Sequence, residues 1–102
     1  SRAVYRVAMQ EGVAAGTLMV TTEWSDWRDR WFWWIQSVYV SPPFRRRGLY
    51  RALHASVIED ARARGDVCGV RLYVDRENHG AIDTYTSLGL RRGNYELMER
   101  EI

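Results

Sequence analysis

The chain has 102 residues, 46 % of them hydrophobic, a length that fits one domain over residues 1–102 and leaves no room for two independent cores. The net charge of +2 is too small for a dedicated nucleic-acid binder, which would carry a strongly basic face. A single cysteine, Cys68, excludes an internal disulfide framework, and with two His residues it gives no convincing metal site, so no metal is expected.

The first half of the chain has the pattern of β-strands. Two apolar stretches, Val4–Met9 and Val13–Val20, flank a short turn that ends in Gly12, and this order predicts a β-hairpin. Residues 21–30 are mostly polar and include Trp24 and Trp27, which predicts a loop or an extension of the second strand. The aromatic and β-branched run Trp31–Val40 predicts a central strand that stops at two consecutive prolines.

Helical periodicity runs from about Arg47 to Arg64. Apolar residues recur there at every fourth position and predict one buried face: Leu49, Leu53, Val57 and Ala61. Gly65 follows the last turn, as expected for a helix C-terminus.

The remaining elements complete the predicted fold. Val67–Val74 predicts a strand, Asn78 is a good N-cap for a helix over His79–Leu88, and Tyr95–Arg100 is expected to return as a last strand. The predicted order is β-β-β-α-β-α-β, which indicates an α/β fold with a mixed sheet and helices packed on it.

The segment between the central strand and the first helix combines the features of an anion site. The unpaired N–H groups of a first helical turn and the positive end of the helix dipole attract anions. Gly48 allows close approach of a ligand to the backbone, and three arginines supply forked donors that suit phosphate: Arg45, Arg46 and Arg47. Together they predict a pyrophosphate cradle, whereas the Arg run alone would fit a solvated basic patch or a nucleic-acid contact.

Two motifs resemble those of the GNAT acetyltransferase superfamily. Its coenzyme loop reads roughly V-x-P-x-x-R/Q-x-x-G-x-G/A, and four residues fall in register with it: Val40, Pro42, Arg45 and Gly48. Its later motif, N-x-x-A-x-x-x-Y-x-x-x-G-F, is matched with Leu90 in place of Phe by Asn78, Ala81, Tyr85 and Gly89. The resemblance departs from the pattern at Tyr50, where the family has Gly or Ala and where a ring would stand close to the phosphates or turn aside.

The resemblance implies a mostly antiparallel sheet and a site for acetyl-CoA. Backbone amides would hold the pyrophosphate, with Arg51 near the first helical turn: Arg45, Arg46, Arg47, Gly48, Leu49 and Tyr50. The strand end would pair its backbone with the pantetheine arm as an added strand: Val38, Tyr39 and Val40. Asn78 and Ala81 would lie near the pantetheine or acyl region, and Asn78 also serves as the helix cap.

Tyr85 is the residue that the resemblance assigns as general acid for the departing thiolate of coenzyme A. The alternative is a core position, because Tyr85 shares one helical face with Ala81, Ile82 and Leu88. A phenol of pKa about 10 does not fully protonate a thiolate of pKa about 8.5, so a positioned hydrogen bond is the more plausible role.

Three explanations are open for how the acceptor amine loses its proton. Many family members carry Glu four residues ahead of the loop Val, and this chain has Gln36 there, which cannot accept a proton. Glu23, with Asp26 near it, is the favoured alternative; Gln36 could also hold a relaying water, or a weakly basic acceptor could need no base. The ordinary interpretation of Glu23 and Asp26 is that they are solvated loop carboxylates.

The five Trp residues are expected to be mostly core or interface, with one or two able to wall the acceptor pocket. Along a strand, Trp31 and Trp33 would share one face while Phe32 and Trp34 share the other. His54 and His79 are expected at the surface or at a helix start.

The resemblance implies an N-acetyltransferase that transfers an acetyl group from acetyl-CoA to a small-molecule or peptide primary amine in a ternary complex. The family usually has a first strand and two helices ahead of the hairpin, and we expect this sequence to start after them, in which case acceptor binding could be incomplete. The main alternative is a non-catalytic acyl-CoA-binding module of the same fold, and a nucleic-acid-binding domain is a distant one. We expect a cytoplasmic bacterial protein without membrane contact, and a homodimer would be common in this superfamily.

Overall fold

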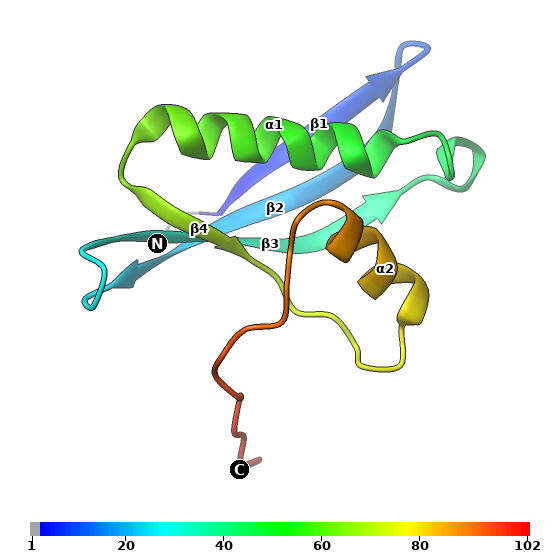
Figure 1. Ribbon diagram of the computed structural model, residues 1–102. Helices are drawn as coiled ribbons and strands as arrows, with labels where there is room; N and C mark the ends of the chain where they lie inside the picture. The colour runs from blue at the N-terminus through cyan, green and yellow to red at the C-terminus, as the bar shows by residue number, and fades with distance from the viewer. Residues whose placement is uncertain (1–2) are drawn as a thin grey trace.

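The computed structural model describes residues 3–102 and shows a twisted sheet with two helices (Figure 1). In chain order the elements are β1 (Val4–Gln10), β2 (Val13–Ser25), β3 (Arg30–Val40), the short 3-10 helix η1 (Pro42–Phe44), α1 (Leu49–Arg64), β4 (Val67–Arg71) and α2 (His79–Ser87). In this part of the chain no helix is both long enough and apolar enough to cross a membrane.

The sheet has the order β1-β2-β3-β4, with the first two pairs antiparallel and the β3–β4 pair parallel. This arrangement confirms the predicted mixed, mostly antiparallel sheet. The hairpin turns at Glu11 and Gly12, whose φ angles of 52° and 80° match the positive φ values that tight hairpins require. The polar segment after Val20 is mainly strand, because β2 extends to Ser25 before the chain turns back into β3.

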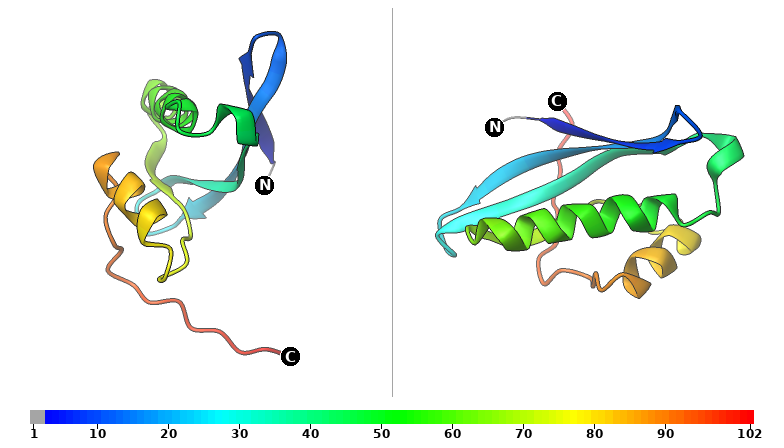
Figure 2. Two further views of the ribbon diagram at one scale, coloured as in Figure 1. Left: turned by 90° about the vertical axis from the view of Figure 1, so that its right-hand side faces the viewer. Right: turned by 90° about the horizontal axis from the view of Figure 1, so that it is seen from above.

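One face of the sheet is covered by α1, which runs along it (Figure 2). The core lies between the two, and the predicted buried face of the helix is confirmed, since Leu49, Leu53, Val57 and Ala61 are all buried. The core cluster joins the helix to the two middle strands through Leu18, Val20, Ile35, Leu53 and Val57. Gly65 ends α1 in the left-handed conformation with φ of 78°.

The parallel pair β3–β4 is shorter than the sequence predicts. Pairing joins Trp31–Trp34 to Val67–Arg71, and β4 ends at Arg71 rather than at Val74. β3 continues to Val40 along β2, so the two parallel strands separate beyond Trp34. The last residues of β3 therefore have one edge that faces a gap instead of a neighbouring strand.

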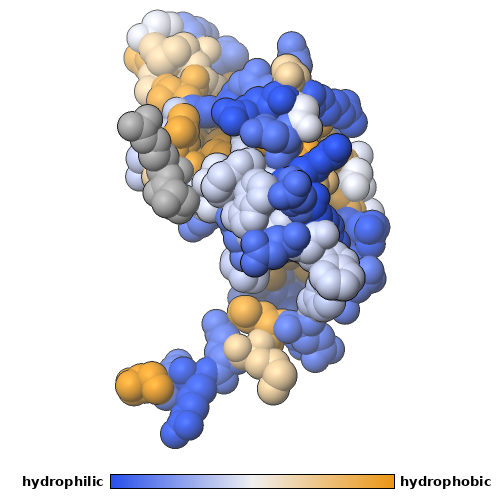
Figure 3. All heavy atoms as spheres, turned by 90° about the vertical axis from the view of Figure 1, so that its left-hand side faces the viewer, coloured by the Kyte–Doolittle hydropathy of each residue, from blue (hydrophilic) through white to orange (hydrophobic). Residues whose placement is uncertain are grey.

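The predicted last strand over Tyr95–Arg100 is wrong. The segment after α2 has no regular secondary structure and leaves the body of the molecule (Figures 1 and 3). A strand forms only where a partner can take its backbone hydrogen bonds. This segment runs away from the sheet, and Tyr95 and Met98 are 79 % and 91 % exposed.

The tryptophans divide into exposed and partly buried groups. Trp27 is 91 % exposed at the β2–β3 turn and Trp24 is 43 % exposed, so neither is a core residue. Trp33 packs against the core on the α1 face, while Phe32 and Trp34 lie on the opposite face beside Arg71, as the strand alternation predicts.

Candidate active site

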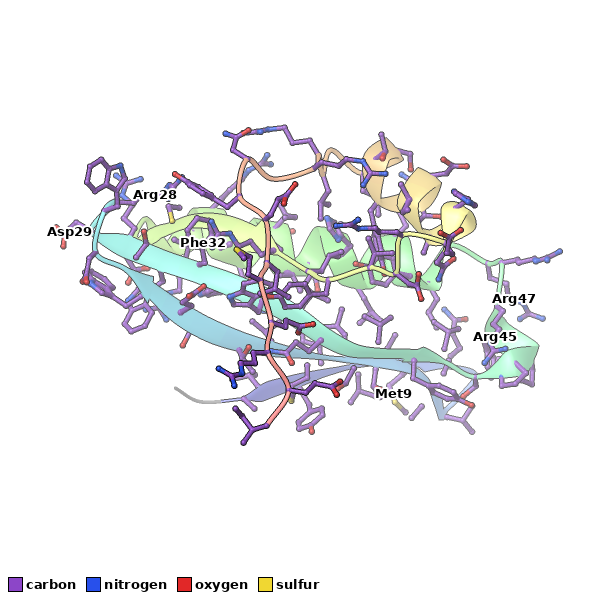
Figure 4. The ribbon with its side chains drawn as sticks, turned by 90° about the horizontal axis from the view of Figure 1, so that it is seen from below. Met9, Arg28, Asp29, Phe32, Arg45 and Arg47 are labelled. Carbon is purple, nitrogen blue, oxygen red and sulfur yellow. The ribbon has the colours of Figure 1, made fainter. Side chains whose placement is uncertain are left out.

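A cavity of about 340 Å³ opens where β3 ends and α1 begins. Its walls come from the strand end, the connecting loop, the first turn of α1 and one residue of α2: Val40, Phe44, Arg45, Arg46, Gly48, Leu49, Tyr50, Arg51 and Thr84. Six of the residues predicted to hold a pyrophosphate, together with Val40, thus line one hollow. Figure 4 shows Arg45 and Arg47 at this end of the sheet, far from Asp29 at the other end.

The loop presents backbone N–H groups to this cavity. Gly48 caps α1 with φ of 73°, a left-handed conformation that favours glycine, and no side chain caps the helix. The helical ladder starts with the bond from Ala52 N to Gly48 O, so the amides of the three preceding residues of α1 have no partner within the helix. No acidic side chain lies in that first turn. The start of α1 is therefore free to bind an anion.

The three loop arginines are not equivalent. The Arg45 side chain folds back and donates from Nε to the Val40 carbonyl at 2.9 Å, with its guanidinium 5.8 Å from the Tyr39 ring centre. Arg47 lies 5.5 Å over the Phe44 ring, and Arg46 has φ of 63°. Arg45 therefore holds the strand end in place. Arg45 and Arg46 line the cavity, whereas Arg47 is exposed beside Phe44 and is not part of the cavity wall.

A β-bulge distorts β3 immediately before the cavity. Thr17 pairs with Tyr39 and Met19 pairs with Gln36, so two β3 residues, Ser37 and Val38, stand opposite the single residue between them on β2. Ser37 has φ of 51°, which is uncommon for a residue other than glycine. The bulge lies on the strand segment whose other edge faces the gap, so it redirects the backbone groups that a ligand in the gap would meet.

Tyr50 turns aside from the loop and packs inward. Its ring contacts the hydrophobic core, and its hydroxyl lies 3.1 Å from Nδ1 of His54, one helical turn later. Burial, and then the neighbouring Tyr85, raises the pKa of Tyr50. The expectation that His54 lies at the surface is wrong, because its side chain is 3 % exposed. Burial, followed by the charge of Arg51, lowers the pKa of His54, so the imidazole is neutral at pH 7.

Tyr85 is half-buried on α2 and meets Tyr50 edge to face, with ring centres 5.6 Å apart and planes at 71°. Burial raises the pKa of Tyr85, so the phenol keeps its proton at neutral pH. The predicted helical face exists, because the half-buried positions of α2 and its C-cap are Ala81, Ile82, Tyr85 and Leu88. None of them is fully buried, so Tyr85 is partly exposed and follows Thr84, the residue of α2 that lines the cavity.

Asn78 is the predicted helix cap. Its side-chain oxygen accepts a hydrogen bond from the Ala81 amide at 3.2 Å. Arg51 donates from Nη2 to the Ser87 hydroxyl at 3.3 Å and so links α1 to α2. Arg51 is thus shared between the cavity wall and the contact of the two helices.

Glu23, the favoured general base, and Gln36, the residue that could hold a relaying water, lie on the sheet face opposite α1. Glu23 accepts a hydrogen bond from the Trp34 indole at 2.9 Å and lies 3.6 Å from Arg71, while Gln36 donates to the Thr21 hydroxyl at 2.6 Å. Trp34 and Gln36 are neighbours on this face, one same-face step or about 7 Å apart along β3. The structure therefore places Glu23 near Gln36 but not in contact with Tyr85, which meets α1.

Sequence comparison decides the family. Residues 1–90 match the acetyltransferase (GNAT) family. The chain belongs to the GNAT family. It is 39 % identical over 66 residues to a mycothiol acetyltransferase of Kocuria rhizophila, and this match covers 65 % of the chain but 22 % of the relative.

Solved GNAT structures agree with this assignment. A possible acetyltransferase from Clostridium difficile 630 is 38 % identical with a TM-score of 0.88, over 96 % of this chain and 64 % of that one. The same fold, at 20 % identity and a TM-score of 0.81, occurs in AAC(6′)-Iy, solved with the bisubstrate analogue CoA-S-monomethyl-acetylneamine; the match covers 98 % of this chain and 69 % of that one. This chain thus spans about a fifth of the curated relative and about two thirds of the structural neighbours.

Three features of this GNAT site were not predicted from the sequence. The bulge at Ser37 has no local sequence signal, because Gln36-Ser37-Val38 reads as ordinary strand. Thr84 reaches the cavity only because α2 lies beside the start of α1 (Figure 2). His54 could have been found, since it follows Leu53 on the helix and lies four residues after Tyr50, a spacing that brings side chains together.

Proposed function

We propose that this GNAT domain is an N-acetyltransferase that binds acetyl-CoA and transfers its acetyl group to a primary amine. The observation that supports it most is the cavity at the start of α1, where unpaired amides and arginines meet the open edge of β3. Acetyl-CoA is the donor that the family uses. Its pyrophosphate matches the amides and arginines in charge, and its extended pantetheine arm matches the open edge of β3 in shape.

The donor would lie along the path that the backbone offers. The amides from Arg46 to Tyr50 and the exposed arginines would hold the phosphates, with Arg51 at the rim. The predicted role of the Arg45 amide does not fit, because that amide already donates to the Pro42 carbonyl at 3.3 Å. The pantetheine arm would then pair with the free edge of β3 at Val38–Val40, as an added strand would. The thioester would reach the gap between β3 and α2, near Asn78, Ala81 and Tyr85.

Acetyl transfer then takes two protons off the ammonium nitrogen and puts one on the sulfur. The amine nitrogen attacks the thioester carbon, the new C–N bond forms, and the C–S bond breaks with its electron pair leaving on sulfur. We assign to Tyr85 a hydrogen bond to that sulfur, because its raised pKa keeps the hydroxyl protonated. The nitrogen loses one proton before it attacks, which for an alkylammonium costs about 4.6 kcal/mol at pH 7, and a second proton as the amide forms.

We assign the proton that the ammonium loses before attack to Glu23, through water. Gln36 cannot take a proton, but it is exposed on the open sheet face next to Trp34, whose indole holds the Glu23 carboxylate. A water on the Gln36 amide could pass the proton toward Glu23. The similarity to the mycothiol acetyltransferase of Kocuria rhizophila favours a small-molecule acceptor. Because this chain spans only part of that relative, we propose the acceptor only by its class, a primary amine.

The first test is a titration of acetyl-CoA into the purified chain, followed by Trp fluorescence and melting temperature. Ligand at about 100 times its Kd should stabilise the fold by about 2.7 kcal/mol, a shift of several degrees for a domain of this size. The double variant Arg45→Ala/Gly48→Asp places a carboxylate at the phosphate site and should abolish the shift. Arg92→Ala, an exposed arginine in the segment after α2, is the matched control and should leave it intact.

Turnover with a panel of amines then separates enzyme from binding module. Saturable binding with acetyl transfer to any amine supports the proposal, and binding without turnover across the panel would favour the non-catalytic acyl-CoA module. Absence of binding at millimolar coenzyme contradicts both. Affinity for nucleic acid that falls steeply with salt would instead favour the distant alternative.

A further inference from the structure

Tyr50 occupies an unusual place in the coenzyme loop. It is the second residue of α1, and its ring stands between the loop cavity on one side and the hydrophobic core on the other. A small side chain at this position would leave that space to the ligand or to solvent. The ring therefore fills a site at which α1, α2 and the cavity meet.

The Tyr50 hydroxyl contacts His54, one turn later on α1. The imidazole is neutral, so one of its nitrogens lacks a proton, and the protonated Tyr50 hydroxyl is the natural donor to Nδ1 at 3.1 Å. This assignment puts the imidazole proton on Nε2, which is buried without a partner among residues 3–102. An unsatisfied buried N–H destabilises the fold, and an apolar residue would avoid that loss. In exchange for this loss, the imidazole accepts the hydrogen bond that orients the Tyr50 ring.

The same Tyr50 ring also contacts the ring of Tyr85. The two rings form an edge-to-face pair at 5.6 Å, and α2 is a helix of nine residues without a fully buried side chain. The position of Tyr85 therefore depends on the few contacts that α2 makes, among them this ring pair and the Arg51–Ser87 hydrogen bond. No hydrogen-bond partner of the Tyr85 hydroxyl occurs within residues 3–102, so it is free to bind a ligand.

We propose that Tyr50 is a positioning residue that, held by His54, sets the place of the Tyr85 ring at the gap. The inference rests on the proposed acetyl transfer, in which Tyr85 protonates or hydrogen-bonds the leaving sulfur. A misplaced acid loses rate without loss of coenzyme affinity, and a shift of about 1 Å can cost about 10²-fold in rate. Tyr50 thus acts on kcat through Tyr85, while the loop amides act on binding.

The test compares Tyr50→Ala, which removes the ring, with Tyr50→Phe, which keeps the edge-to-face contact but loses the bond to His54. Each variant is made in the full chain labelled with 3-fluorotyrosine, and Tyr85→Phe identifies the fluorine signal of Tyr85. Coenzyme affinity is measured with coenzyme A alone, and kcat with an amine that the unchanged protein acetylates. Tyr95→Ala, at a tyrosine that is 79 % exposed, is the matched control.

For Tyr50→Ala we expect a moved Tyr85 signal, kcat lower by about 10- to 100-fold and a Kd for coenzyme A within about threefold. Tyr50→Phe keeps the ring and loses only the hydrogen bond to His54, so it should shift the signal and lower kcat in the same direction but less than Tyr50→Ala does. An unmoved signal, or a kcat loss that only mirrors lost coenzyme affinity, would overturn the proposal. If Tyr50→Ala does not fold, Tyr50→Leu fills the space without an aromatic edge and is judged by the same readings. If the unchanged protein acetylates no amine, the proposed function fails, and the fluorine signal still decides whether Tyr50 positions Tyr85.

Discussion

At the scale of single residues, burial sets the protonation of the site. Desolvation raises the pKa of Tyr50 and of Tyr85 and lowers the pKa of His54. All three groups are consequently neutral at pH 7. Neutral phenols keep the proton that the proposed hydrogen bond to the leaving sulfur requires, and a neutral imidazole can accept a hydrogen bond from Tyr50.

Replacement of Tyr85 by Phe should separate the hydroxyl from the ring. The variant keeps the edge-to-face contact with Tyr50 and loses the proposed proton donor. We expect kcat to fall by about 10²-fold or more, with the KM for acetyl-CoA nearly unchanged. Steady-state acetylation of an accepted amine measures both constants, and a kcat equal to that of the unchanged protein would remove Tyr85 from the mechanism.

His54 should make the fold sensitive to mild acid. Its pKa is lower in the folded than in the unfolded chain, so below about pH 6.5 the unfolded chain binds more protons and stability falls with falling pH. His54→Leu should remove up to about 1 kcal/mol of the loss between pH 7 and about pH 5.5. Urea unfolding at the two pH values tests this, and an equal loss in both proteins would contradict it.

At the scale of elements, the site depends on the first turns of two helices, whose free backbone amides are capped differently. The amides at the start of α1 have no side-chain cap and are free for a ligand, whereas the Asn78 side chain caps α2. The periodicity of the sequence predicted both helices. It could not predict the short pairing of β3 with β4, because the separation of these strands depends on where neighbouring elements lie and not on local propensity.

The cap at Asn78 gives a prediction for α2 alone. Asn78→Ala removes the acceptor for the Ala81 amide and should destabilise the helix by about 1 kcal/mol, while Asn78→Asp keeps an acceptor oxygen. Amide hydrogen exchange should become about fivefold faster in α2 of the Ala variant, with little change in α1. Uniform acceleration in both helices would show that α2 does not open on its own.

At the scale of the whole molecule, one small core joins α1 to the sheet and fixes the cavity between them. Leu18 and Val57 are its fully buried side chains and come from β2 and α1. The loop that carries the arginines connects these same two layers. Loss of core packing should therefore affect stability and coenzyme binding together.

Leu18→Ala tests this dependence. The substitution leaves a cavity beneath α1 and should cost about 2–5 kcal/mol, a large part of the stability of a domain of this size. Leu97→Ala, at a side chain that is 63 % exposed, should change stability by no more than about 0.5 kcal/mol. Urea unfolding of the two variants gives the comparison, and a small effect at Leu18 would mean that the core does not hold the layers together.

The sequence by itself determined the elements with strong local signals and the loop that ends in Gly48. Regular apolar spacing specified α1, turn chemistry specified the β1–β2 hairpin, and two spaced motifs placed the coenzyme loop and Tyr85 in one family. These features depend on residues near one another in the chain, so their pattern is visible without the fold.

Only the tertiary structure decided how distant residues meet. It turned the Tyr50 ring onto Tyr85 of α2, put Glu23 on the opposite face of the sheet from α1, and left Tyr95–Arg100 without a strand partner. Each outcome depends on burial or pairing between segments far apart in the chain, and the free energy of such contacts is set by the packed neighbours rather than by the local sequence.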